Sequence, residues 1–154
     1  MKYVRRVLQP GESVVHETHI HPIIFLTAAL WFVAAFIVLI ASLIGFSGDP
    51  RIIGEAVAVF CLIFALAAAI PALIRRLSTE LAVTDRRVIY KAGILARHTL
   101  EMNRSKVESV DVDQSLLGRL LGFGTIIVRG TGGSLEPIRM ISDPLTFRSH
   151  ITAG

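Results

Sequence analysis

Cysteine is almost absent: Cys61 is the only one among 154 residues, and it lies within an apolar run. A single thiol excludes an intramolecular disulfide, a CxxC redox motif and a cysteine-based zinc site. Its apolar neighbours indicate a small packing residue instead.

Motifs for catalysis are also missing. The chain has no serine nucleophile elbow, no cysteine–histidine pair and no close pair of carboxylates. The glycine-rich run 129–134 lacks the Lys-Ser/Thr of a phosphate loop, and a strand is expected to follow it rather than a helix. We therefore predict that the protein is not an enzyme and has neither a catalytic nor a cofactor site.

Charge is moderate and unevenly distributed. Sixteen Lys and Arg against twelve Asp and Glu give a net charge of +4, with no concentrated basic patch. A mild basic excess suits an anionic membrane face better than nucleic acid, so we expect membrane lipids as partners and no nucleic acid.

Charged residues are scarcest in two long apolar runs, Ile23–Phe46 and Ala56–Ile74, which the short polar link 47–51 joins. A bilayer core of roughly 30 Å needs about 20 helical residues, and both runs reach that length. The first run starts too late and is too long for a cleavable signal peptide. The pattern predicts a transmembrane helical hairpin over residues 23–76.

The basic residues outside the hairpin indicate its orientation. Lys2, Arg5 and Arg6 precede the first run, and Arg75 and Arg76 follow the second. The positive-inside rule then places the N- and C-termini of this multi-pass protein in the cytoplasm.

Small residues recur in both runs at intervals that allow helix backbones to approach closely. Two explanations stay open: packing within one hairpin, or contact between subunits of a homo-oligomer or with other membrane proteins. The candidate packing residues are Ala41, Gly45, Gly54, Ala58, Ala65 and Ala69.

From residue 77 onward the apolar pattern changes to alternation, which is typical of half-buried strands. A short helical turn is expected at Leu116–Leu121 and a helix after Asp143-Pro144. The lead 1–22 includes a strand-like stretch at 12–20 that could join the sheet of the domain 77–154. Strands are expected near 79–84, 87–92, 95–102, 107–113, 124–130 and 134–141.

This second half resembles the bacterial pleckstrin-homology (PH) domain membrane proteins. The resemblance covers most of residues 78–150, and the two preceding apolar runs fit the same layout. The matching residues are Thr84-Asp85-Arg86-Arg87-Val88-Ile89-Tyr90, Gly93, Val107, Val110, Gln114-Ser115 and Leu120-Leu121-Gly122-Phe123-Gly124.

The resemblance implies an α+β fold in which a membrane hairpin precedes a small antiparallel PH-like β-barrel or sandwich with a C-terminal helix. It also implies a location in the bacterial inner membrane, membrane association and oligomer formation, without catalytic activity. The expected Thr84–Arg87 turn is tight, unlike the long basic loop that wraps inositol phosphates in eukaryotic PH domains.

Two groups of residues are candidates for contact with lipids or partners. Four leucines on one short turn exceed what a single buried side requires, although packing against the end of the sheet is the alternative. Arginines could meet lipid phosphates. The candidates are Arg75, Arg76, Arg86, Arg87, Leu116, Leu117, Arg119 and Leu120.

A third group, His16, His19 and His21, is a weak candidate for a divalent metal because imidazoles beside a carboxylate suit zinc. Polar histidines at an interface explain the same pattern, and we predict no metal site.

The favoured hypothesis is a non-enzymatic membrane protein whose tethered PH-like domain serves protein interaction or oligomerisation. Two alternatives stay open. One is a sensor of anionic lipid headgroups, and the other is an accessory subunit of a larger inner-membrane complex.

Overall fold

The computed structural model describes residues 2–94, 98–131, 133–134 and 137–153. The chain divides into two compact units, one formed by residues 1–21 together with 74–154 and the other by residues 22–73. The expected strand positions 95–97 and 135–136 lie outside the described residues.

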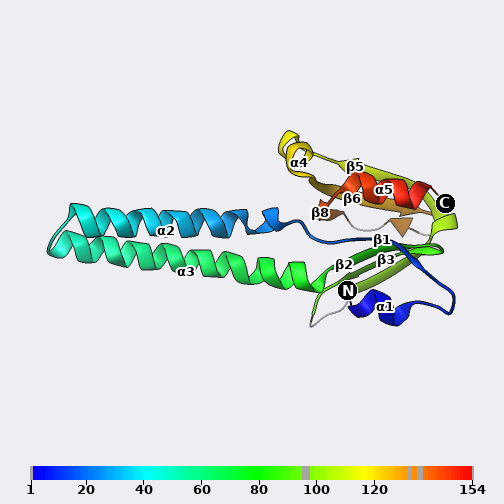
Figure 1. Cartoon of the computed structure of the whole chain (residues 1–154), viewed down its shortest axis with the longest axis horizontal. Helices are drawn as coiled ribbons and strands as arrows, with labels where there is room; N and C mark the ends of the chain where they lie inside the picture. The colour runs from blue at the N-terminus through cyan, green and yellow to red at the C-terminus, as the bar shows by residue number, and fades with distance from the viewer. Residues whose placement is uncertain (1, 95–97, 132, 135–136, 154) are drawn as a thin grey trace. The chain divides into compact units, whose positions relative to one another are not determined.

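The unit 22–73 is a helical hairpin (Figure 1). A 3-10 turn, η1 (Pro22–Phe25), leads into α2 (Leu26–Gly45), and α3 (Asp49–Ser78) returns antiparallel to it and continues into the other unit. Both helices are long and apolar enough to cross a membrane. Most of their large apolar side chains face outward, as the apolar runs predict for helices solvated by lipid.

The other unit contains two four-stranded antiparallel sheets, as the alternating pattern predicts. In the first, the strand order is β1-β2-β3-β4, and in the second β6 lies between β5 on one side and β7 and β8 on the other. The strands are β1 (Val14–Thr18), β2 (Glu80–Thr84), β3 (Arg87–Ala92), β4 (His98–Asn103), β5 (Val107–Asp113), β6 (Phe123–Gly130), β7 (Gly133–Ser134) and β8 (Ile138–Ser142).

The stretch 12–20 supplies β1, which precedes the hairpin in the sequence. It pairs antiparallel with β2, which follows the hairpin. Beyond β1 the chain turns to the second sheet, where Ile20 forms an isolated bridge with Ile141. Ser142 N also donates to His19 O at 3.0 Å. One N-terminal segment therefore connects both sheets.

The two sheets form a sandwich, and among the described strands they do not close into the barrel that we considered. The 3-10 turn η2 (Arg104–Lys106) separates β4 from β5, and the described pairings contain no ladder between these two strands. A tight hairpin would have kept them in one sheet.

The C-terminal helix covers apolar residues of the two sheets. α5 (Pro144–Thr152) buries Phe147 and Ile151 against strands of both sheets, as the one-turn spacing of these residues predicts. Arg104 Nη2 donates to His150 O at 2.7 Å, so a cation lies at the C-terminal end of α5, where it complements the helix dipole.

The short helix α1 (Lys2–Val7) was not expected from the sequence. The Glu80 carboxylate accepts from Tyr3 N at 3.0 Å and from Val4 N at 3.2 Å, which satisfies free amides at the start of α1. Val4 packs with Ala82 and Ile89, so β2 and β3 are covered on the face that carries α1.

Candidate functional site

The helix α4 (Leu116–Leu121) begins and ends at defined caps. Gly118 N donates to Ser115 Oγ at 3.0 Å, and Gly122 adopts the left-handed conformation, with φ of 75°. A Cβ on Gly118 would lie 2.6 Å from Phe123 O, so this residue forms the face that packs on the start of β6. The caps and the glycine contact fix the direction of the other side chains.

The leucines of α4 consequently point outward. Their exposed fractions are 84% for Leu116, 65% for Leu117, 81% for Leu120 and 47% for Leu121. Packing against the end of the sheet, the alternative considered from the sequence, does not occur for Leu116 or Leu120. We name these four residues the leucine surface.

Arg119 stands beside the leucine surface and is exposed. It lines a shallow hollow of about 270 Å³ together with Leu145, which is itself 58% exposed at the start of α5. Arg119 and Leu145 therefore add a cation and a further apolar side chain next to the leucine surface.

The candidate arginines differ in their surroundings. Arg86 and Arg75 are exposed, and Arg75 Nη2 donates to Arg139 O at 3.4 Å. Arg76 is half-buried. The side chain of Arg87 is only 11% exposed, because it forms an internal ion pair.

The partner of Arg87 is Glu12, whose side chain is fully buried. Two bonds join them: Arg87 Nη2 to Glu12 Oε2 at 2.7 Å and Arg87 Nε to Glu12 Oε1 at 2.9 Å. Arg87 also donates to Glu101, and Thr84 Oγ1 donates to Glu12 at 2.7 Å. The hydrogen bonds from Arg87 lower the pKa of Glu12 to about 2 against the opposing effect of burial.

Sequence reasoning missed Glu12 because its partner lies 75 positions away. The Thr84–Arg87 turn did contain a signal for a buried partner of Arg87. An arginine at the start of β3, just after a tight turn, lies near the strand that pairs with β2. The ion pair joins the N-terminal lead to β3 and leaves little of the Arg87 side chain exposed.

The three histidines of the lead point to different neighbours. His16 stacks on His150 with ring centroids 4.5 Å apart, and His21 lies against Phe123 at 5.4 Å. His19 is exposed. Among the described residues, no group of three or more His, Cys, Asp or Glu side chains could hold a metal ion.

The small residues of the hairpin differ in burial. Ala58 and Ala65 are buried, and a Cβ on Gly54 would lie 2.7 Å from Ser42 Cβ. Ala41 and Gly45 are exposed, and no described atom lies within 4 Å of a Cβ on Gly45. Ala69 is half-buried.

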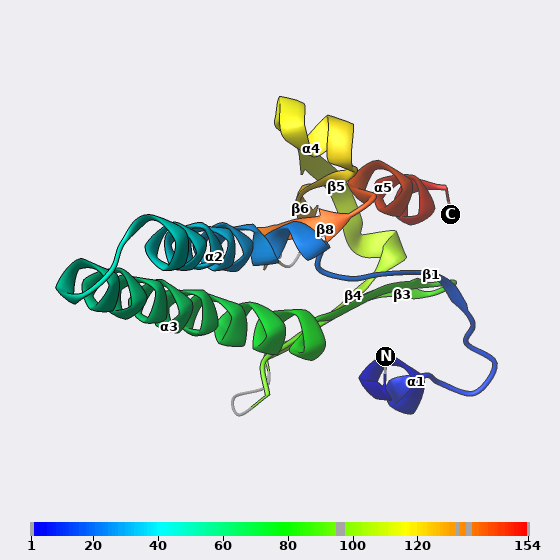
Figure 2. The same cartoon turned by 60° about the vertical axis from the view of Figure 1, so that its left-hand side comes forward.

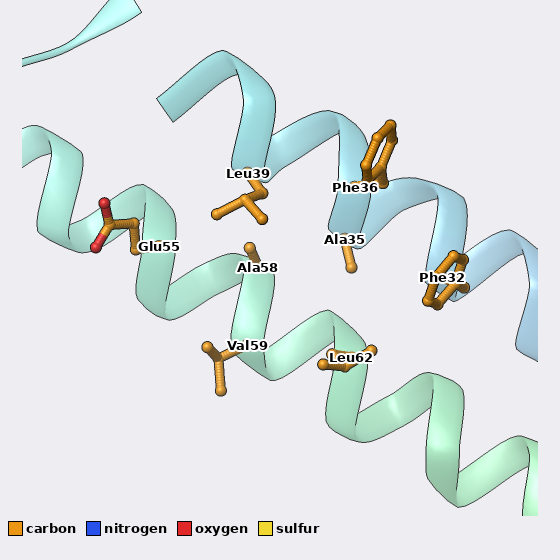
Figure 3. A pocket seen from close by; sticks show the side chains of 8 residues that line it. All are labelled: Phe32, Ala35, Phe36, Leu39, Glu55, Ala58, Val59 and Leu62. Carbon is orange, nitrogen blue, oxygen red and sulfur yellow. The ribbon is translucent and has the colours of Figure 1, made fainter. Parts of the chain in front are cut away.

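An open apolar groove of about 430 Å³ runs along the hairpin. Figure 3 shows Phe32 and Phe36 from α2 on one side of it and Val59 and Leu62 from α3 on the other. Glu55 lies at one end and pairs with Arg51 at 2.9 Å.

The family model for the bacterial PH domain matches residues 22–153, which include both the hairpin and most of the sandwich. The search of curated proteins and the search of solved structures returned no match. PH-like domains are in general binding modules rather than catalysts. The match covers most of the chain and agrees with the sandwich and the C-terminal helix described above, and the protein therefore belongs to the bacterial PH domain family.

Proposed function

We propose that this protein is a non-enzymatic, membrane-anchored interaction module of the bacterial inner membrane. In this proposal α2 and α3 cross the bilayer, and the PH-like domain works at the cytoplasmic surface. Self-association, or association with other membrane proteins, is the proposed activity.

The observation that carries the proposal is the double attachment of the domain to the hairpin. β1 runs into α2, and α3 runs into β2, and these two strands are paired neighbours, with Thr18 opposite Leu81. The hairpin is thus an insertion between adjacent strands of one sheet. A domain attached at two points stays at the membrane, where a high effective concentration of neighbours makes weak contacts productive.

Anchoring is tested by cysteine accessibility in a Cys61→Ala background. We expect Gly48→Cys, in the link between α2 and α3, to react with an impermeant maleimide added to the periplasmic side. Ala153→Cys is expected to react only after the cytoplasmic side is opened. Labelling of both positions from the same side would overturn the hairpin topology.

The interaction role is tested by native mass spectrometry of the protein released gently from its own membrane. A homo-oligomer supports self-association, and stoichiometric co-purification of other proteins favours an accessory subunit. A lone chain would overturn both.

An anionic-lipid sensor is the second candidate, because Arg75 reaches the backbone of Arg139 and brings two basic residues together. Arg86 adds an exposed cation elsewhere on the domain. The sensor requires that anionic lipids remain bound in the same native spectra and that high salt releases them.

A further inference from the structure

The proposed interaction role does not by itself say what covers the leucine surface. Four of the six residues of α4 are exposed leucines, whereas Ile126 and Val128 of the neighbouring strand β6 are fully buried. Figure 2 shows α4 extending away from β5 and β6. A soluble domain rarely leaves such a group of large apolar side chains in water.

We propose that α4 inserts the leucine surface into the interfacial layer of the bilayer that anchors the chain, with Arg119 at the lipid phosphates. This inference rests on the proposed membrane anchoring. It assigns the bilayer itself, rather than a protein, as the occupant of this surface.

The outward direction of the leucines is built into the fold. Ser115 and Gly122 cap both ends of α4, and Gly118 packs against the carbonyl of Phe123. Gln114 Nε2 also donates to Phe123 O at 3.0 Å. Because glycine occupies the packed face, no rotation of the helix could bury the leucines without breaking these contacts.

The apolar arc of α4 and the cation beside it together favour the bilayer as the occupant. At about 100° per residue, the four leucines spread over about 140° of the helix circumference. An arc of this width is the apolar face of an amphipathic helix, which in the membrane interface is buried at the boundary between headgroups and acyl chains. Arg119 flanks the arc, and basic residues beside apolar ones are typical of helices in the membrane interface.

The attachment to the hairpin keeps the unit that contains α4 close to the bilayer in the proposed anchoring. A folded unit of roughly 100 residues has a radius of gyration of about 13 Å, which corresponds to a diameter of about 35 Å. Attachment at both ends of the hairpin keeps the bilayer at a high effective concentration for the surface of this unit. Insertion then requires rotation of the domain and no diffusion from solution.

The test uses fluorescence quenching by brominated lipids in nanodiscs that contain the full chain. Trp31 of α2 is the only tryptophan and is partly exposed on the hairpin, so its quenching reports membrane insertion of the unchanged protein. In a Trp31→Phe background, Leu120→Trp reports on α4, and Leu117→Trp provides a second probe. The nanodiscs contain phosphatidylcholine and phosphatidylglycerol, brominated or not.

We expect loss of emission from both α4 probes in brominated lipid. As the matched control, Leu116→Gln together with Leu117→Gln is expected to abolish quenching of the Leu120→Trp probe, and Arg119→Glu should weaken it mainly in phosphatidylglycerol. Emission from the α4 probes that is independent of bromination, while Trp31 is quenched, overturns the inference and leaves the anchoring intact. Unquenched Trp31 overturns the anchoring itself.

A second measurement identifies the competing occupant. In a Cys61→Ala background, Leu120→Cys is exposed to a mild oxidant in the same nanodiscs. Little disulfide-linked dimer is expected if lipid covers α4. Efficient dimer formation without lipid quenching would assign the surface to a second copy and overturn the inference.

Discussion

At the scale of single residues, the two arginines of the Thr84–Arg87 turn have different roles. Arg86 remains in solvent, whereas Arg87 connects β3 to the lead through Glu12. A positive side chain that is held by a buried carboxylate offers little to a lipid phosphate. The basic face available to a ligand is therefore smaller than the number of arginines suggests.

We expect Glu12→Gln to lower the free energy of unfolding of the PH-like domain by about 3 kcal/mol, because breaking a buried pair leaves Arg87 poorly compensated. Hydrogen exchange of the β2 and β3 amides in nanodiscs measures the effect. Since the pKa of Glu12 falls from 4.5 to about 2, the stabilisation is complete above pH 4.5 and is lost as the pH falls through about 2.

The matched control for Glu12→Gln is Asp111→Asn, which breaks the exposed pair with Arg129. Exposed pairs contribute about 1 kcal/mol or less. Equal effects of the two substitutions would contradict the structural role assigned to Glu12.

A second residue-scale prediction concerns His16. Burial, followed by the charge of His150, lowers the pKa of His16, and the opposing carboxylates of Asp143 and Glu17 do not reverse the shift. The unfolded chain binds this proton more readily, so stability is full above about pH 6.5 and declines as the pH falls below it.

We expect His16→Gln to flatten the decline of domain stability between about pH 7 and pH 5, where an unshifted histidine titrates. Hydrogen exchange in nanodiscs over that range is the measurement. His19→Gln, at an exposed position of the same lead, serves as control, and an identical flattening by both variants would argue against a specific role for His16.

At the scale of elements, much of the fold follows from local pattern. The apolar runs predict α2 and α3, and Ser115 and Gly122 mark the ends of α4 in the sequence as they do in the structure. The helix α1 escaped notice because its amides are satisfied by Glu80, a residue far along the chain. Capping by a distant carboxylate leaves no local signal.

The candidate site was partly predictable for the same reason. An excess of leucine on a short turn is visible in the sequence, and the structure shows which side carries it. The burial of Arg87 depends on Glu12, which lies before the hairpin in the sequence, whereas Arg87 lies after it. Residue spacing alone does not reveal such a distant partner. The small residues of the hairpin likewise separate into buried and exposed sets only once the two helices are packed.

Two glycines of the hairpin allow an element-scale prediction. We expect Gly54→Ala to destabilise the hairpin by about 1–3 kcal/mol, because the new Cβ would lie 2.7 Å from Ser42 Cβ. Gly45→Ala is the matched control, since its Cβ meets no described atom within 4 Å, and it should be neutral or stabilise the helix slightly. Thermal unfolding in detergent, followed by helical circular dichroism, compares them, and equal melting temperatures would contradict the packing described.

At the scale of the whole molecule, the PH-like unit is assembled from the sequence segments that precede and follow the hairpin. The lead contributes β1 and α1, and it buries Val4 and Ile20 almost completely. Without it, β2 becomes an open edge strand, and the apolar residues that contact Val4 lose their cover. The segment 77–154, the expected domain, lacks the β1 and α1 that pack in this unit.

We expect the fragment 77–154 alone to lack a cooperative fold, and a chain that joins residues 2–21 to 77–154 through about eight Gly and Ser residues to recover it. The linker has this length because it must run from His21, whose N donates to Met140 O in the second sheet, back to the start of β2. Dispersion of amide NMR signals distinguishes the two proteins. A well-dispersed spectrum from the fragment alone would show that the lead is dispensable for folding. Only the connection from α3 to β2 would then join the hairpin to a part that the fold requires.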